Sequence, residues 1–360
     1  MTSEEGQANE PDEEELLGRA TEAGIHRLAI PTPFQVGRVN AYLIEDSPLT
    51  LIDSGPSSER SLLELEQGLA ARGHAVEDIE LLVITHQHVD HFGLAATLAR
   101  RSGAEVAALD GLVPYLREFE TNTELDDRFA QRVMLRHGIP DDVIEALRTV
   151  SASFRTWGAA VEVTRPLRDG ERLCLRDRSL RVLHRPGHSP SDTVFVEDRA
   201  EEEEEDRSEN AQGAIMFSGD HLLANISSNP LLARPLGAGP DFTGPRPRAL
   251  IDYIASLERT RAMDLSLVLG GHGPPIADHS SLVELRLSMH RRRAERIHGL
   301  IADRPLTAHE IAVELWGNVA VTQAYLTLSE VLGHVDLLQD EGRAVERVES
   351  EADVVRFAAV

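Results

Sequence analysis

One stretch of the sequence decides how this chain folds: Leu81-Leu82-Val83-Ile84-Thr85-His86-Gln87-His88-Val89-Asp90-His91. Its apolar first half is typical of a short strand that is buried on both faces. Its second half places four metal-binding side chains within six positions, where this strand gives way to the next helix. His86 and His88 are two residues apart, so on an extended backbone they can point the same way. Imidazole and carboxylate ligands favour a Zn-type ion, with Mn or Fe as alternatives, and four of them can serve two adjacent metals.

Strand-like and helical stretches alternate on both sides of residues 81–91. Before them, we expect strands at 25–30, 40–44 and 49–52 and a helix over 58–72. After them, we expect a helix over 92–101, a strand at 105–109 and a charge-rich helical insertion over 112–158. Later strands are expected at 160–163, 173–175, 180–184, 193–196, 214–218 and 265–269, with a helix over 248–261. Two groups of strands interleaved with helices predict a layered α/β or α+β sandwich.

The character of the sequence changes at about residue 285. A basic helix follows, which contains Arg286, Arg296 and the cluster Arg291–Arg293. Helical stretches over 307–315 and 322–338 then lead to strand-like residues 343–349. Three helices followed by a small β-wing predict a winged-helix domain over 286–350, attached to a first domain over 21–285.

Cysteine usage restricts the chemistry of any metal site. Cys174 is the one cysteine among 360 residues, so an intramolecular disulfide and a cysteine-based zinc site are both excluded. Histidine and carboxylate side chains must therefore hold any metal. Cys174 itself lies in a strand-like stretch and is expected to be a small residue of the core.

Negative charge is concentrated in two segments of the chain. The net charge is −25, and we expect residues 1–20 to form a disordered acidic tail and residues 199–211 an acidic loop. An acidic chain repels phosphate backbones at long range, which disfavours nucleic acid as a partner. No apolar run approaches the roughly 18 residues that span a membrane, and the acidic start has neither a secretory nor a transit signature. The sequence therefore predicts a cytoplasmic protein with no membrane partner.

Three further motifs accompany the cluster at residues 86–91, and each lies just after a strand-like run. They are Pro186-Gly187-His188-Ser189, Phe217-Ser218-Gly219-Asp220 and Gly270-Gly271-His272-Gly273-Pro274. With this order and these ligand types, the chain resembles the metallo-β-lactamase superfamily over residues 25–285. The resemblance implies an αββα sandwich whose site lies on loops at strand ends.

The resemblance also implies a role for each ligand residue. It assigns one Zn²⁺ to His86, His88 and His188, the other to Asp90, His91 and His272, and the bridge between them to Asp220. Two carboxylates offset about half the charge of two Zn²⁺, which leaves room for a bridging hydroxide. Coordination lowers the pKa of water toward ~7, so this nucleophile exists at neutral pH. Asp90 and Asp220 are the expected catalytic residues, and Asp90 would also orient the hydroxide and take its proton.

Asp53 ends the strand-like stretch at 49–52 and has two interpretations. By the resemblance, it is an acceptor that fixes a ligand histidine. Alternatively, it only forms the turn before Gly55, and the sequence weighs the two equally. His184 and His221 lie close to ligands, and we expect them to pack or to support a ligand rather than to bind metal.

The ligand set and the C-terminal domain narrow the substrate class. Asp220 at the bridging position resembles the thioesterase, lactonase and nuclease branches rather than the β-lactamases that carry Cys there. The 286–350 domain resembles the winged helix of the β-lactamase-like protein 2 group, which is related to glyoxalase II. That group includes a single-strand endoribonuclease and thioesterase relatives.

Three functions remain open. The favoured one is hydrolysis of a small acyl compound, a thioester or a lactone, in a pocket formed by the 112–158 insertion and the loop at 225–234. The second is cleavage of single-stranded RNA, with Arg234 and Arg291–Arg293 holding phosphates. The third is a non-enzymatic winged-helix regulator, which the complete ligand set argues against.

The expected recognition helix at 322–338 disfavours nucleic acid. It contains no Arg, and residues 286–360 hold 9 Arg against 12 acidic residues, whereas nucleic-acid modules present a basic face. We therefore expect the winged helix to wall the active site or to form a dimer contact. A small-molecule substrate and a homodimer are the partners that the sequence favours.

Overall fold

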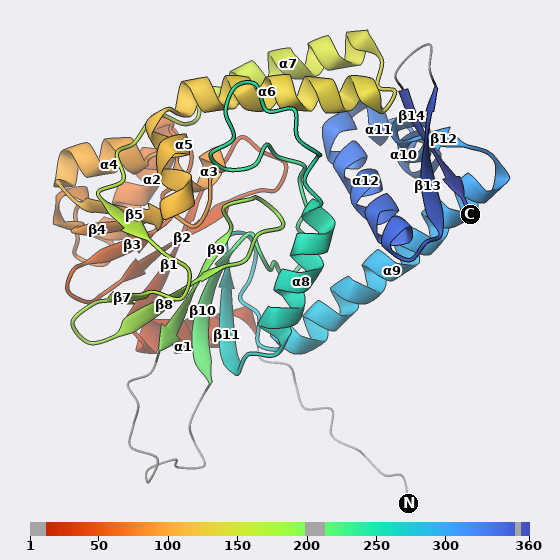
Figure 1. Ribbon diagram of the computed structural model, residues 1–360. Helices are drawn as coiled ribbons and strands as arrows, with labels where there is room; N and C mark the ends of the chain where they lie inside the picture. The colour runs from red at the N-terminus through yellow and green to blue at the C-terminus, as the bar shows by residue number, and fades with distance from the viewer. Residues whose placement is uncertain (1–11, 199–212, 350–353) are drawn as a thin grey trace, which may run out of the picture.

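Two β-sheets packed face to face form the centre of the molecule (Figure 1). The structure is a computed structural model and describes residues 12–198, 213–349 and 354–360. The first sheet contains, in spatial order, β1 (Ile25–Ile30), β2 (Val39–Ile44), β3 (Thr50–Ile52), β4 (Leu81–Val83), β5 (Glu105–Leu109) and β6 (Arg165–Leu167). The second contains, in spatial order, β11 (Leu265–Gly270), β10 (Ala214–Gly219), β9 (Thr193–Asp198), β8 (Ser179–His184) and β7 (Arg172–Cys174).

The strand directions determine where the motif-bearing loops emerge. β3, β4, β5 and β6 run parallel to one another, and β10 runs parallel to β11. β8 and β10 both pair antiparallel with β9, so these two strands run the same way. The loops after β3, β4, β8, β10 and β11 therefore leave the sheets at carboxyl ends, which is where open α/β sheets build their sites.

Helices cover both outer faces of the sandwich. α2 (Glu59–Ala70) begins at Ser58, whose hydroxyl accepts the Ser61 N–H at 3.0 Å, and it packs Leu65 and Leu69 onto the first sheet together with α4 (Ala95–Ser102). α8 (Ala249–Arg261) and α9 (His279–Asp303) cover the second sheet. A further apolar core that includes Phe217 lies between the sheets. The expected αββα sandwich is confirmed.

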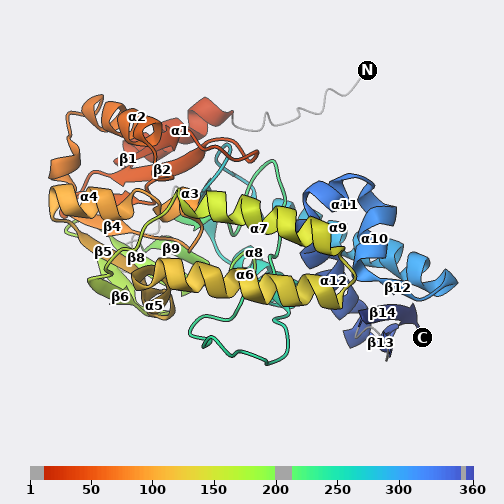
Figure 2. The same ribbon diagram turned by 90° about the horizontal axis from the view of Figure 1, so that it is seen from above.

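The helical insertion lies across one end of the sandwich (Figures 1 and 2). It contains α5 (Val113–Arg117), α6 (Phe119–Arg136) and α7 (Asp141–Arg155). α6 and α7 lie side by side and reach from the sandwich to the C-terminal unit (Figure 2). The expectation of a strand at 160–163 is wrong: the Val161 N–H donates to the Leu116 carbonyl instead of to a strand, and pairing with β5 begins only at Arg165.

The C-terminal unit follows α9 and has its own three-stranded sheet. Its elements are β12 (Leu306–Thr307), α10 (Ala308–Trp316), α11 (Val319–Thr322), α12 (Ala324–Asp340), β13 (Ala344–Glu349) and β14 (Val354–Ala359), with strand order β12-β14-β13. This arrangement is compatible with the expected winged helix. The expected limits differ from the structure, because residue 286 falls inside the continuous helix α9 and β14 extends the unit past residue 350.

The insertion and the C-terminal unit share one hydrophobic core. Met134 of α6 and Ile144 of α7 pack in the same cluster as Leu328 of α12. The backbone N–H of His309 in α10 also donates to the carbonyl of His137, just after α6, at 3.2 Å. The far ends of α6 and α7 are therefore anchored on the C-terminal unit.

Two expectations about the outside of the molecule are wrong. Residues 13–20 are not a tail, because α1 (Glu13–Glu22) is a helix capped by Asp12 that buries Leu16 between the sheets. Cys174 is exposed, because successive side chains of a strand point to opposite faces and Leu173 takes the inward position. Residues 1–11 and the predicted acidic loop at 199–211 lie outside the described residues. Within the described ranges, no helix is long and apolar enough to cross a membrane.

Candidate metal centre

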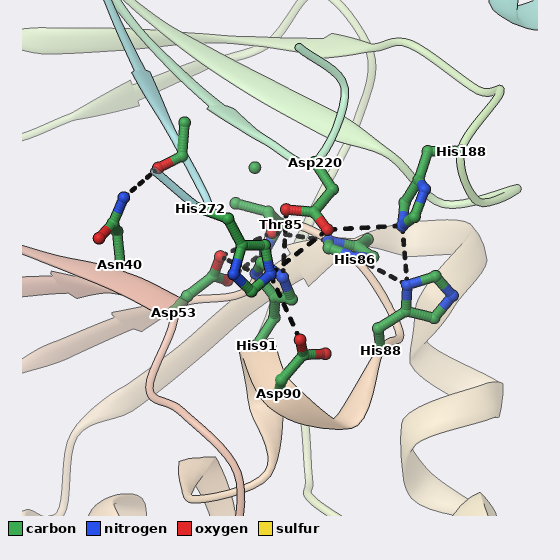
Figure 3. A network of polar contacts seen from close by, with 12 residues as sticks. Asn40, Asp53, Thr85, His86, His88, Asp90, His91, His188, Asp220 and His272 are labelled. Carbon is green, nitrogen blue, oxygen red and sulfur yellow. Dashed lines mark hydrogen bonds and ion pairs between the residues drawn. The ribbon is translucent and has the colours of Figure 1, made fainter. Parts of the chain in front are cut away.

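All seven predicted ligands meet at the edge of the sandwich where the strands end (Figure 3). The short helices η1 (Val76–Asp78), η2 (Asp110–Leu112) and α3 (Val89–Phe92) complete the first half of the fold, and α3 begins directly after His88. His86, His88, Asp90 and His91 therefore belong to the junction between β4 and α3. His188 comes from the loop between β8 and β9, and Asp220 and His272 follow the parallel strands β10 and β11.

The ligand atoms form two groups that share Asp220. In the first group, Nδ1 of His88 lies 3.1 Å from Nε2 of His86 and 2.9 Å from Nε2 of His188. In the second group, Nε2 of His272 lies 3.3 Å from an Asp90 carboxylate oxygen.

The Asp220 carboxylate lies between the two groups in Figure 3. Its Oδ2 is 3.6 Å from Nε2 of both His188 and His272, and its Oδ1 is 3.4 Å from Nε2 of His91. Gly271 makes this arrangement sterically feasible, because a Cβ there would meet Asp220 Oδ1 at 2.4 Å. A substitution at Gly271 would therefore displace the shared carboxylate.

Hydrogen bonds on the outer side of the centre fix how the histidines are oriented. Three of them donate through Nδ1 to an oxygen, namely His91 to Asp53 (2.7 Å), His188 to the Asn229 carbonyl (3.1 Å) and His272 to the Arg38 carbonyl (2.8 Å). A histidine that donates through Nδ1 presents an unprotonated Nε2 as a metal ligand. These contacts therefore direct three lone pairs into the centre.

Asp53 is the main support of the β4–α3 junction. Its carboxylate accepts from His91 Nδ1, from the Thr85 N–H at 2.9 Å and from the Thr85 hydroxyl at 2.8 Å. The Thr85 hydroxyl oxygen lies 3.0 Å from His86 Nδ1, so Asp53 also orients His86 through Thr85. Asp53 has a φ of 58°, which is costly for a residue other than glycine. It makes the contact that the resemblance implies, from within the turn.

Burial and mutual fields set the charge state of the centre. Burial lowers the pKa of His88 to about 3, and burial together with the neighbouring His91 and His88 holds the pKa of His86 well below its usual value. Burial alone would raise the pKa of Asp220, but His272, His91 and His188 outweigh it and hold that pKa well below the usual range. His86 and His88 are therefore neutral at pH 7, while Asp220 is ionised.

Unsatisfied buried atoms indicate that the donor set fits cations. Among the described residues, Nε2 of His91, Nε2 of His272 and Oδ1 of Asp220 are buried without a hydrogen-bond partner. Each such atom costs about 1–3 kcal/mol unless something satisfies it. All three face the same centre, together with neutral imidazoles and the Asp90 carboxylate. Nitrogen and oxygen donors in this proportion suit divalent cations.

Two supporting residues were missed by the sequence reasoning. Asp192 accepts from the Ser189 N–H at 2.9 Å and from the Ser189 hydroxyl at 2.6 Å, which shapes the loop that carries His188. Its position four residues after His188 was a usable signal. Arg286 of α9 is buried and donates to the carbonyls of Leu223, Ala224 and Ile226, just after Asp220. Nothing in the sequence distinguishes it from the other arginines of that basic helix.

Other predicted residues do not reach the centre. Nε2 of His184 bonds to the Pro190 carbonyl at 2.9 Å and Nε2 of His221 to the Thr260 hydroxyl at 2.8 Å, as expected for supporting histidines. Arg234, considered as a phosphate ligand, is only 6% exposed and pairs with Asp126 at 3.0 Å. Its guanidinium is therefore committed within the protein.

A cavity of about 520 Å³ opens beside the centre. Gln87, His88, Val89 and Asp90 line it at the metal-centre side. The remaining walls come from α6, from α7, from residues 231–234 and from the start of α12. This is the location in which the sequence predicted a substrate pocket between the insertion and the 225–234 loop.

Known proteins resemble this chain in sequence and in fold. Residues 35–201 match the family described as the metallo-beta-lactamase superfamily. The chain is 32% identical over 314 residues to the probable metallo-hydrolase YqjP of Bacillus subtilis (strain 168). This alignment covers 87% of this chain and 92% of YqjP. It is 30% identical over 196 residues to the Homo sapiens acyl-coenzyme A thioesterase MBLAC2. This alignment covers 51% of this chain and 58% of MBLAC2.

A solved structure extends the likeness to the C-terminal unit. A metallo-beta-lactamase family protein from Thermus thermophilus aligns with a TM-score of 0.72 at 26% identity, over 94% of this chain and 99% of that one. The likeness to YqjP likewise extends over nearly the whole of both chains. The sandwich, the ligand motifs and these likenesses agree, and the chain belongs to the metallo-beta-lactamase superfamily as a metallo-hydrolase.

Proposed function

We propose that this protein hydrolyses an acyl substrate, a thioester or a lactone, with two zinc ions as cofactors. The main support for this proposal is the largely apolar cavity, which opens directly onto His88 and Asp90. Sites for small molecules are typically concave and apolar with a few polar groups where chemistry occurs. The likeness to a thioesterase supports the thioester in particular.

Each ligand residue has a proposed role. One zinc would be held by His86, His88 and His188, the other by Asp90, His91 and His272, and Asp220 would bind both. Bound there, the metals would supply a water-derived nucleophile at neutral pH and a Lewis acid for the acyl carbonyl. The two groups of nitrogen and oxygen atoms that share the Asp220 carboxylate support this assignment.

The protein's own residues would position the substrate and move a proton. Asp90 lies both in the ligand cluster and in the cavity wall, so its carboxylate can accept a proton from the attacking water and return it to the leaving group. Asp53 and Thr85 keep His91 and His86 in place during the reaction. Val89 and Phe34 line the same cavity and would exclude bulk water.

We also propose that the C-terminal unit is a winged helix that completes the cavity rather than reading nucleic acid. Tyr325 and Leu326 at the start of α12 line the cavity. Arg293 forms an ion pair with Glu330 and lies over the Trp316 ring, so it is not presented as a phosphate ligand. Arg234 is buried in an ion pair. These contacts weaken the alternative of RNA cleavage.

A side-by-side assay tests the proposal. Purified zinc-loaded protein is incubated with acyl-CoA thioesters, a lactone and a single-stranded RNA oligomer. We expect hydrolysis of a thioester or the lactone and no cleavage of RNA. Cleavage of RNA alone, with binding that weakens steeply as salt rises, would contradict the proposal and favour the nuclease alternative.

A further inference from the structure

One face of α6 forms a long wall of the cavity. Phe119, Thr123, Asp126, Ala130 and Met134 all line it. Their spacing of four, three, four and four residues places them on a single face of the helix. At 1.5 Å per residue, the wall from Phe119 to Met134 is about 22 Å long. The cavity is therefore an elongated channel rather than a round pocket.

The two ends of this wall have different surroundings. The Phe119 ring packs on Phe92 at 5.3 Å, and Phe92 is the residue after His91, so this end lies beside the metal centre. Met134 instead belongs to the core that α6 shares with the C-terminal unit. Figure 2 shows α6 and α7 lying side by side over this span. The channel runs from the metal centre toward the C-terminal unit.

Away from the metal centre, charged groups in the channel wall are held in ion pairs. Arg148 of α7, which lines the channel, pairs with Glu145 at 3.0 Å. Asp126 accepts from Arg234 at 3.0 Å and from the Tyr115 hydroxyl at 2.9 Å. Asp127 accepts from the Ser151 hydroxyl at 2.6 Å and pairs with Arg155. Polar groups that satisfy one another have little left to offer a polar ligand.

Apart from Arg148, Ser151 and Arg155 of α7, the other walls of the channel are mainly apolar. Leu147 and Phe154 of α7 lie opposite α6, and Leu232 and Leu326 close the side toward the C-terminal unit. Phe154 also packs edge-on against Phe34 at 5.1 Å, so the wall continues to the loop between β1 and β2. A short acyl group would leave most of this apolar surface facing water, which is unfavourable.

We propose that the acyl group is a long, unbranched aliphatic chain that lies along α6, and that Met134 at the distal end limits its length. This inference rests on the proposed function, because the acyl carbonyl must sit at His88 and Asp90 for the chain to enter the channel. Ala130 lies one helical turn, or about 6 Å along the helix, closer to the metal centre than Met134 does. A bulky residue there should limit the chain at a shorter length than one at Met134.

Three tryptophan variants of α6 test the channel. Ala130→Trp blocks it midway and Met134→Trp blocks its distal end. Leu135→Trp is the matched control, because Leu135 lies on the same helix, is 43% exposed and does not line the cavity. Thermal unfolding checks each fold, and Ala130→Leu and Met134→Phe replace any tryptophan variant that fails to fold.

The first measurement is kcat/KM for acetyl-, butyryl-, octanoyl-, lauroyl- and palmitoyl-CoA. We expect the unmodified protein and Leu135→Trp to prefer palmitoyl- over acetyl-CoA by at least about tenfold, since each buried methylene contributes to binding. In Met134→Trp, kcat/KM should fall for palmitoyl-CoA. In Ala130→Trp, kcat/KM should fall for lauroyl-CoA as well, and both variants should keep butyryl-CoA hydrolysis. Equal rates for all lengths, or equal losses at all lengths in the variants, would overturn the inference and leave the proposed function standing.

The second measurement does not depend on turnover. Binding of palmitate to metal-stripped protein is followed by displacement of a fluorescent fatty acid. We expect binding in the unmodified protein and in Leu135→Trp, and at least about tenfold weaker binding in Ala130→Trp. If neither a thioester nor a lactone is hydrolysed, the proposed function fails and this binding alone decides the channel. Absence of palmitate binding would overturn it.

Discussion

Buried histidines gather in two regions of this protein, the metal centre and the interior of the C-terminal unit. In the second region, His290 of α9 lies against Glu330 and His334 of α12, and these three residues could also hold a metal ion by distance alone. All three are as buried as the residues of the metal centre. Residue type and burial therefore do not separate the two regions.

Hydrogen bonding and charge do separate them. In the C-terminal cluster, His334 Nδ1 donates to the Glu330 carbonyl at 2.6 Å, His290 Nδ1 lies 3.1 Å from His334 Nε2, and the Glu330 carboxylate pairs with Arg293. Of these ring nitrogens, Nε2 of His290 alone lacks a partner among the described residues. The Arg293 guanidinium already supplies the positive charge that a metal would bring.

The metal centre differs from this cluster in both its charge and its hydrogen bonding. The carboxylates of Asp53, Asp90 and Asp220 lie among its imidazoles, and the buried atoms without partners face one another across the centre. Unsatisfied buried atoms beside several carboxylates, rather than the presence of histidines, therefore distinguish the metal centre from the C-terminal cluster.

The largest effect is expected from Asp220→Asn. The change removes the charge that both ligand groups share, so kcat/KM should fall by at least about a thousandfold, or about 4 kcal/mol of transition-state stabilisation. Metal content should also fall below two equivalents, while circular dichroism stays unchanged. Retained activity and metal in this variant would refute the shared role of Asp220.

Glu330→Gln is the matched change in the C-terminal cluster. It should leave metal content and kcat/KM unchanged, because the cluster holds no metal in this account. It should lower the free energy of unfolding by about 1–3 kcal/mol, since Arg293 loses its carboxylate partner. Urea unfolding and metal analysis measure both effects, and a loss of metal would break the comparison.

Metal removal should destabilise the sandwich. Without cations, the buried atoms that lack partners stay unsatisfied and the folded state loses the stabilisation of metal binding, so chelation should lower Tm by roughly 5 °C or more. Stepwise addition of zinc should restore Tm. The Glu330→Gln variant should respond in the same way, whereas Asp220→Asn should regain only part of the loss.

Acid should destabilise the C-terminal cluster. Burial lowers the pKa of His290 and of His334 to about 4, whereas the unfolded chain binds these protons near pH 6.5. The unfolded state therefore holds more protons between those values, and stability falls as the pH falls through this window, by about 2 kcal/mol per histidine between pH 7.5 and 5. Urea unfolding of metal-stripped protein at both pH values measures the fall. The double variant His290→Gln/His334→Gln should show a smaller fall in the free energy of unfolding. A fall as large as that of the unmodified protein would show that other groups cause the acid effect.

The smallest effect is expected from Arg286→Lys. Arg286 donates through Nη2 to the Leu223, Ala224 and Ile226 carbonyls, and a lysine ammonium has a shorter reach and a different geometry, so the loop after Asp220 should loosen. We expect kcat to fall by roughly threefold to tenfold with metal content retained. An unchanged kcat would mean that the loop does not need this anchor.

Much of the sandwich and all seven centre residues could be predicted because the signals are local. An apolar run followed by ligands marks a strand end, and four such motifs occur in order. Asp53 was ambiguous from sequence, because its acceptor role depends on His91, which is 38 positions away. Arg286 was invisible for the same reason, since its carbonyl partners lie about 60 positions away.

The errors also have physical causes. Cys174 is exposed because of which face of β7 it occupies, and composition does not determine that face. The expected domain limit at 286 falls inside α9, because this one continuous helix packs on both the sandwich and the C-terminal unit. The homodimer, the cytoplasmic location and the identity of the metal stay predictions.

The strongest test of the dinuclear centre is stepwise addition of zinc to metal-stripped protein, with bound metal and thioester hydrolysis measured together. We predict that activity rises until two zinc ions are bound per chain, and that Glu330→Gln follows the same curve. Full activity at one equivalent or without metal, in a normally folded protein, would contradict the dinuclear centre.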